Sequence, residues 1–210
     1  MANSTDARMG GSGQNSEQTK ARILSAAEEL FGANGFQKTR LEDVAAAAQV
    51  SRPLVYRYFS NKETLFGLVV ERILREWNEV LIAEAARKTP STAHTLRRVL
   101  TACLDFAQSR TVLRGLLSRD SKLVLSHFDI IQRTNDMLRH LVRDVLESGG
   151  ARGDVRTDLD FEDLAHVVSE VFIAYSDHIV AGETTSLSER RVEAIIETLL
   201  HGITMPVGPR

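Results

Sequence analysis

The amino-acid sequence predicts an all-α protein of about nine helices, because three features favour helix and none favours strand. None of the four prolines lies between Ser91 and Met205, so most of the chain can run as uninterrupted helices. Residues that favour helices, chiefly Ala, Leu, Glu and Arg, are abundant. No segment alternates apolar and polar residues for long enough to predict a β-strand.

The composition is that of an ordinary soluble protein with one large domain or two small ones. Of its 210 residues, 43% are hydrophobic and 26% are charged, which is too apolar for a disordered chain and too charged for a membrane protein. No apolar stretch reaches the roughly 18 residues that a membrane span needs, and the N-terminus lacks the apolar core of a signal peptide. The single cysteine, Cys103, excludes an intrachain disulfide and a cysteine-cluster metal site. We therefore expect a cytoplasmic protein with no cofactor, no metal and no membrane partner.

Charge and composition divide the chain into parts. Residues 1–62 contain eight Lys and Arg against six Asp and Glu, so this part is the better candidate for binding an anion. Residues 1–16 are small and polar and are predicted to form a disordered tail. A first helical domain is expected over 17–77 and a second over 78–205, followed by a short tail at 206–210.

Local signals place helix ends in the first domain. The helical period begins at residue 17, and an Asn-Gly pair at 34–35 should end this helix. Thr39 with Glu42 fits a capping box at the start of the next helix. Ser51 is expected to cap a third helix, with a proline in its first turn, and residues 60–63 form a second capping box that opens a long helix.

Residues 39–59 are thus predicted to form two short helices joined by a tight turn at Gln49 and Val50, the arrangement of a helix-turn-helix. The second helix of that motif can lie in the major groove of DNA. Val55 and Phe59 fall on one face and should be core. Helical hairpins are common in all-α proteins, so spacing alone leaves a purely structural hairpin open. Two arginines and two tyrosines within seven residues are unusual for a buried helix.

Residues 19–69 resemble the N-terminal DNA-binding domain of the tetracycline-repressor family of bacterial transcription regulators. The matching stretches are TKARILSAAEELFGANGF, TRLEDVAAAAQVS and RPLVYRYFSNKETLF. The pattern Y-x-x-F at 56–59, followed by K-E-x-L, is a specific ending of this family's motif. Beyond these residues the resemblance is one of helical architecture only.

The predicted DNA contacts rest on position and on this resemblance. Arg52, Pro53 and Leu54 stand at the start of the second helix, where such helices meet base edges. The resemblance implies contacts with the DNA backbone from Thr39, Arg40, Tyr56, Arg57, Tyr58 and Lys62.

Three residues depart from the family pattern. Gln49 stands where glycine is frequent, and a positive φ there would cost glutamine on the order of 1 kcal/mol. Pro53 replaces a small residue, so base preference cannot be taken from relatives. Tyr58 replaces a histidine and keeps a hydrogen-bonding group.

The second domain should contain helices near 91–109, 111–117, 121–148, 161–180 and 188–202, with the longest break at GGARGDVRTDLD. The last two helices carry broad apolar stripes, which suit a four-helix contact between two protomers, although burial within one chain is the alternative. The predicted interface consists of Leu164, Val168, Val171, Phe172, Tyr175, Ile195, Ile196 and Leu199.

The same domain offers aromatic and polar residues that could line an effector pocket, although ordinary core or surface is the commoner role for each. The candidates are Trp77, Cys103, Phe106, His127, Phe128 and Tyr175. The leading hypothesis is a homodimeric repressor that binds a palindromic operator in double-stranded DNA and is released by a small molecule. A ligand-blind regulator of the same fold and a helical enzyme using Cys103 or a histidine are the alternatives, but no catalytic constellation is visible.

Overall fold

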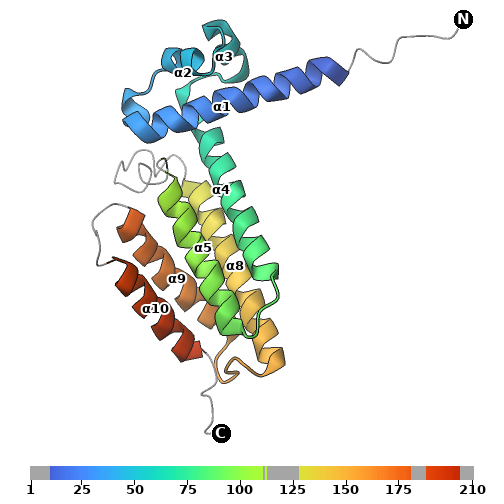
Figure 1. Cartoon of the computed structure of the whole chain (residues 1–210), viewed down its shortest axis with the longest axis vertical. Coiled ribbons are helices and arrows are strands. Elements are labelled where there is room, and N and C mark those ends of the chain that lie inside the picture. The colour runs from blue at the N-terminus through green and yellow to red at the C-terminus, as the bar shows by residue number, and fades with distance from the viewer. Residues whose placement is uncertain (1–9, 111, 113–127, 181–187, 204–210) are drawn as a thin grey trace, which may run out of the picture. The chain divides into compact units, whose positions relative to one another are not determined.

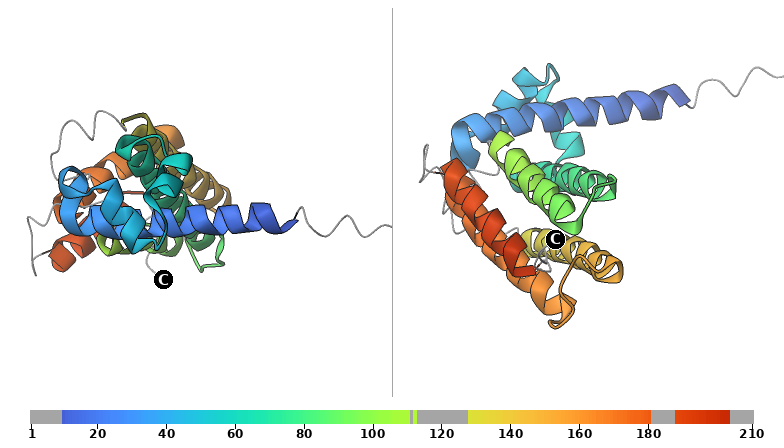
Figure 2. Two further views of the ribbon diagram at one scale, coloured as in Figure 1. Left: turned by 90° about the horizontal axis from the view of Figure 1, so that it is seen from above. Right: turned by 60° about the horizontal axis from the view of Figure 1, so that its bottom comes forward.

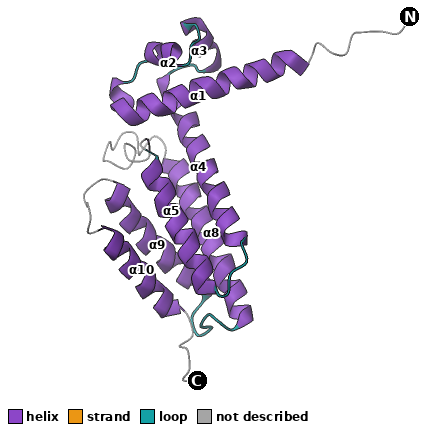
Figure 3. Cartoon of the chain, viewed as in Figure 1, coloured by secondary structure: helices purple, strands orange, loops and turns teal. Residues whose placement is uncertain are grey.

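The computed structural model of the protein describes residues 10–110, 112, 128–180 and 188–203, and its elements in these ranges are α-helices without a β-strand (Figures 1 and 3). The all-α prediction is therefore confirmed. The helix predicted at 111–117 and the start of the one predicted from residue 121 lie outside the described residues. The helices are α1 (Gly10–Lys38), α2 (Leu41–Ala47), α3 (Arg52–Tyr58), α4 (Lys62–Ala86), α5 (Thr92–Ser109), α8 (Phe128–Arg152), α9 (Phe161–Val180) and α10 (Ser188–Ile203).

The chain divides into two compact units, Met1–Arg72 and Ile73–Arg210. The predicted boundary at residue 77 falls a little later, within the same helix, α4. In the first unit α1 begins at Gly10, so residues 10–16 are helical where the composition predicted disorder. The helical backbone is interrupted at Gly35, which has φ 77° and ψ 165°, close to the predicted end. Glycine adopts this conformation without a steric penalty.

The core of the first unit joins all four of its helices. Phe31 of α1 meets Phe66 of α4 edge to face, with ring centroids 5.0 Å apart. Val44 of α2 is fully buried, and so are Val55 of α3 and Phe59, which directly follows α3. The two short helices are therefore held by packing, since each is too short to be stable alone.

The predicted helix caps are partly wrong. The N-cap residue of α2 is Arg40, and it makes no side-chain cap, so the capping box at Thr39 does not form. Ser51 does occupy the N-cap position of α3, with proline in the first turn, but its hydroxyl does not bond to the helix. At α4 the cap is Asn61, whose Oδ1 accepts from the Thr64 N–H at 2.7 Å. Sequence patterns locate helix starts better than they identify the capping atom.

In the second unit, the last part of α4 and the helices α5, α8, α9 and α10 surround one apolar core. Helix α8 packs against α5 and α9, and α10 runs beside α9 (Figures 1 and 2). Four of these helices contribute large core side chains that are at most 1% exposed, among them Leu96, Leu100, Val142, Leu146, Val168 and Ile196.

The predicted break between α8 and α9 begins later than expected. Gly149 and Gly150 lie inside α8, which continues to Arg152. A Cβ atom at Gly149 would collide with Thr92 and with Val155, and one at Gly150 would collide with the ring of Phe161. These two glycines therefore serve close packing, and glycine as a helix breaker was the wrong reading for them.

Candidate functional site

Helix α3 has a buried face and an exposed face. Val55 and Phe59 are fully buried, which confirms the predicted core positions. Tyr56, between them in the sequence, keeps 50% of its surface exposed. Since residues three and four apart share a helix face, the exposed side chains gather on one side. They are Arg52, Pro53, Tyr56 and Arg57.

The positive charges on this surface are not neutralised within the chain. Arg40 and Arg52 are exposed, and their guanidinium groups make no hydrogen bond or ion pair with any described residue. Arg22 and Arg72 in the same unit behave differently: Arg22 donates to the Ala48 carbonyl at 2.5 Å, and Arg72 pairs with Glu28 at 2.5 Å. The free guanidinium groups are thus concentrated beside the helix-turn-helix, where they favour an anionic partner.

The turn between α2 and α3 has the backbone that the sequence analysis required of it. Gln49 has φ 53°, so a non-glycine residue does occupy the left-handed region. Arg22 supports the turn from α1, since its guanidinium donates to the carbonyls of Ala48 and Gln49. This arginine clamp was not identified from the sequence, because its partners are backbone atoms more than 20 residues away.

Lys62 was predicted to contact phosphate, but the structure gives it partners in its own chain. Its Nζ donates to the carbonyl oxygens of Phe36 at 2.9 Å and of Gln37 at 3.4 Å. The ammonium also lies 4.4 Å from the centroid of the Phe36 ring. The positive charge of Lys62 therefore interacts with backbone carbonyls and an aromatic ring near the end of α1.

Three further predicted contacts are also occupied or partly buried. Thr39 is 1% exposed, and its hydroxyl donates to the carbonyls of Leu30 and Gly35 at 3.1 and 2.9 Å. The Tyr58 hydroxyl is 2.9 Å from the Ser16 hydroxyl. Leu54 is half-buried. Of the residues predicted to contact DNA, Arg40 and the four exposed residues of α3 thus remain accessible.

Comparison with known families identifies this unit. The family model for bacterial regulatory proteins of the tetR family matches residues 23–69, which include α2, α3 and the start of α4. Residues 23–69 thus form a DNA-binding domain of the tetR type. The match agrees with the resemblance of residues 19–69 to the DNA-binding domain of that family.

Similar proteins span most of the chain. The HTH-type transcriptional repressor NicS of Pseudomonas putida is 27% identical over 155 residues, which cover 70% of each protein. The reduced form of E. coli NemR has the same fold, with a TM-score of 0.74 at 16% identity over 90% of this chain and 99% of that one. SmeT is the repressor of a Stenotrophomonas maltophilia multidrug efflux pump. Its complex with triclosan has a TM-score of 0.71 at 21% identity, over 90% of this chain and 93% of that one.

The structure brings together half of the predicted effector residues. The rings of Trp77 and Phe106 stack with centroids 6.2 Å apart and an interplanar angle of 3°. Burial raises the pKa of the Cys103 thiol far above its usual value, which outweighs the opposing effect of the Trp77 side chain. A thiol that stays protonated is a poor nucleophile, which disfavours an enzyme acting through Cys103. His127 lies outside the described residues, and the side chains of Phe128 and Tyr175 are likewise not described.

Five of the eight residues predicted for the dimer interface belong to the protomer's own core or pack against it. Leu164, Val168, Phe172 and Ile196 are buried inside the second unit, at most 8% exposed, and Leu199 packs against the same core. Of the predicted set, Val171 is 41% exposed and Ile195 is half-buried, while Tyr175 is not described. Val167, which the sequence analysis missed, is 55% exposed on the same helix as Val171. The apolar residues of α9 thus occupy both an inner and an outer face.

A groove lies on the second unit away from the predicted effector residues. It has a volume of about 320 Å³ between α4 and α8 and is lined by none of them.

No helix among the described residues combines the length and apolarity that crossing a bilayer requires. In the same residues, no three His, Cys, Asp or Glu side chains gather as a metal site would need.

Proposed function

We propose that this protein is a tetR-family regulator, a ligand-responsive repressor that binds a palindromic operator as a homodimer. The observation that carries the proposal is the pair of free, exposed guanidinium groups of Arg40 and Arg52 on a helix-turn-helix. Other arginines of the same unit, such as Arg22 and Arg72, are tied to partners. Unpaired cations on one surface are suited to a polyanion, because contacts with phosphates release its counterions.

Each exposed residue has a proposed role. Arg52 at the start of α3 reads a base edge, since its guanidinium can donate two hydrogen bonds to guanine. Pro53 beside it contacts the groove through its apolar ring. Arg40, Tyr56 and Arg57 bind phosphates, which positions α3 without reading sequence.

The dimer forms through the outer faces of α9 and α10. Val167 and Val171 are large apolar side chains that the protomer leaves exposed on one helix. Ala194 and Thr198, four residues apart on α10, are small and exposed and allow a second helix to approach closely. A two-fold pair of reading helices matches two half-sites about one DNA turn or a multiple apart, which is why the operator should be palindromic.

The effector binds near Trp77, Cys103 and Phe106. The Trp77 indole nitrogen is buried and makes no hydrogen bond of normal geometry among the described residues. The Cys103 sulfur beside it is a weak acceptor, and a poorly satisfied buried donor is costly, so a ligand that supplies a stronger acceptor gains affinity there. SmeT has been solved with triclosan, which is a precedent for a small molecule on this fold. Release follows if the ligand prefers a conformation in which the two reading helices are wrongly spaced.

The experiment selects an operator from a random DNA pool and measures its dissociation constant between about 50 and 200 mM salt. With 6–10 phosphate contacts, affinity should fall by roughly 10³–10⁵ over this range. The double variant Arg40→Ala/Arg52→Ala should abolish specific selection, whereas Arg133→Ala, which removes an exposed arginine of α8, should not. Salt-independent binding, or selection that survives the double variant, would refute the proposal.

A further inference from the structure

The groove between α4 and α8 has an apolar floor. Leu81 and Leu138 are buried at its base, at 2% and 4% exposure. Ile82 and Met137 flank them and remain 53% and 44% exposed, although both are large and apolar. Contiguous exposed apolar side chains in a concave site favour a partner that covers them. The full lining is Asn78, Leu81, Ile82, Met137, Leu138, His140, Leu141 and Asp144.

The polar groups at the rim include hydrogen-bond acceptors that no described residue uses. His140 Nδ1 is 2.7 Å from the carbonyl oxygen of Asp136, and because a carbonyl only accepts, Nδ1 carries the hydrogen. The Nε2 atom of a neutral His140 ring is then an acceptor. Asn78 Nδ2 donates to the Met137 sulfur at 3.2 Å, and its Oδ1 is an acceptor.

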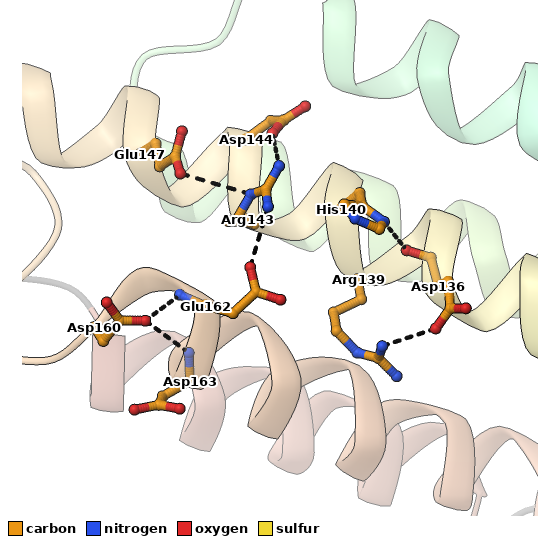
Figure 4. A network of polar contacts seen from close by, with 9 residues as sticks. All are labelled: Asp136, Arg139, His140, Arg143, Asp144, Glu147, Asp160, Glu162 and Asp163. Atoms are coloured by element: carbon orange, nitrogen blue, oxygen red, sulfur yellow. Dashed lines mark hydrogen bonds and ion pairs between the residues drawn. The ribbon is translucent and has the colours of Figure 1, made fainter.

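The remaining polar group of the rim is the carboxylate of Asp144, and its charge is incompletely neutralised. Arg143 approaches it at 3.4 Å but also contacts Glu162 at 3.1 Å and Glu147 at 3.6 Å (Figure 4). One guanidinium is thus shared among three carboxylates. No Lys or Arg belongs to the groove lining. The rim is therefore acidic and rich in acceptors.

We propose that this groove binds a small organic cation whose ammonium group faces Asp144 and His140 while its apolar body covers Ile82 and Met137. An ammonium group has three donors and no acceptor, which complements the rim. The groove lining includes none of the proposed effector residues Trp77, Cys103 and Phe106.

The test uses three probes of one shape on the full chain: 4-phenylbutylammonium, 4-phenylbutan-1-ol and 4-phenylbutyrate. Titration calorimetry at low salt should give the order ammonium, alcohol, carboxylate, from tightest to weakest. We expect the ammonium to bind about 5- to 10-fold more tightly than the alcohol, because Asp144 is exposed and solvent screens its charge. Ile82→Ser should weaken the ammonium and the alcohol by the same factor, since both use the apolar floor.

Asp144→Asn should remove the preference for the ammonium and leave the affinity for the alcohol unchanged. The matched control is Glu147→Gln on the same helix, which removes the same charge and also touches Arg143 but does not line the groove. The proposal is overturned if the ammonium and the alcohol bind equally, if none of the probes binds at ~10 mM, or if Glu147→Gln acts as strongly as Asp144→Asn. Operator affinity measured on the same samples without probe reports on the DNA-binding proposal separately.

Discussion

The Nζ atom of Lys62 lies 2.9 Å from the carbonyl oxygen of Phe36 and above the ring of the same residue. This contact ties the first residue of α4 to the chain just after the interruption of α1 at Gly35. The carbonyls at a helix end lack helical partners, so a cation there satisfies them. We therefore expect the lysine that the family resemblance assigned to phosphate to stabilise the first unit.

Lys62→Met should therefore lower the stability of the first unit by about 1–2 kcal/mol, since it removes charged hydrogen bonds and a cation–π contact. The salt dependence of operator binding should stay unchanged. Urea unfolding and salt titrations on the same variant test this. An unchanged unfolding midpoint, together with a salt slope reduced by about one contact, would mean that Lys62 contacts a DNA phosphate.

Arg52→Ala should relax the preference at one or two base positions at a cost of about 1–3 kcal/mol. Arg52 is exposed at the first position of α3 and has no partner among the described residues, so its removal should leave the fold intact. A panel of operators with single-base changes measures the preference. Arg40→Ala is the comparison, since a phosphate contact should weaken every operator alike. Equal losses across the panel for Arg52→Ala would exclude base reading.

Gln49→Gly should stabilise the first unit by up to about 1 kcal/mol, because glycine adopts the φ of 53° found at this position without strain. Ala47→Gly, two residues earlier and exposed at the end of α2, is the matched control. It should cost up to about 1 kcal/mol, since glycine is disfavoured within a helix. Thermal unfolding of both variants shows whether each substitution raises or lowers the stability. A destabilised Gln49→Gly variant would mean that the glutamine side chain makes a stabilising contact.

Val167→Glu/Val171→Glu should produce monomers with retained helicity and no operator affinity. Both side chains are exposed in the protomer, so glutamates there cost the fold little but place charge in the proposed interface. Ile195→Glu/Leu199→Glu should instead lose helicity, because Leu199 packs against the protomer's own core. Sedimentation and circular dichroism separate the two outcomes. If the valine variant still sediments as a dimer, the interface lies elsewhere.

Local patterns in the sequence were sufficient to predict the helix-turn-helix. Helix positions, the buried Val55 and Phe59 and the strained turn at Gln49 all depend on residues a few positions apart. Periodicity and steric limits on φ act over that range. The hydrogen bonds that Thr39 and Lys62 make within the chain were not predicted, because their partners are backbone carbonyls of the preceding segment, which no pattern in residue types reveals.

The sequence by itself determined that α9 is apolar around much of its circumference, but not which side faces inward. Val168 and Phe172 are buried, while Val167 and Val171, one position earlier in each case, are exposed. Adjacent helix positions differ by about 100° in direction, so both pairs satisfy the same hydrophobic period. Only the packing of α5, α8 and α10 against α9 decided between them, because burial depends on which neighbours cover a face.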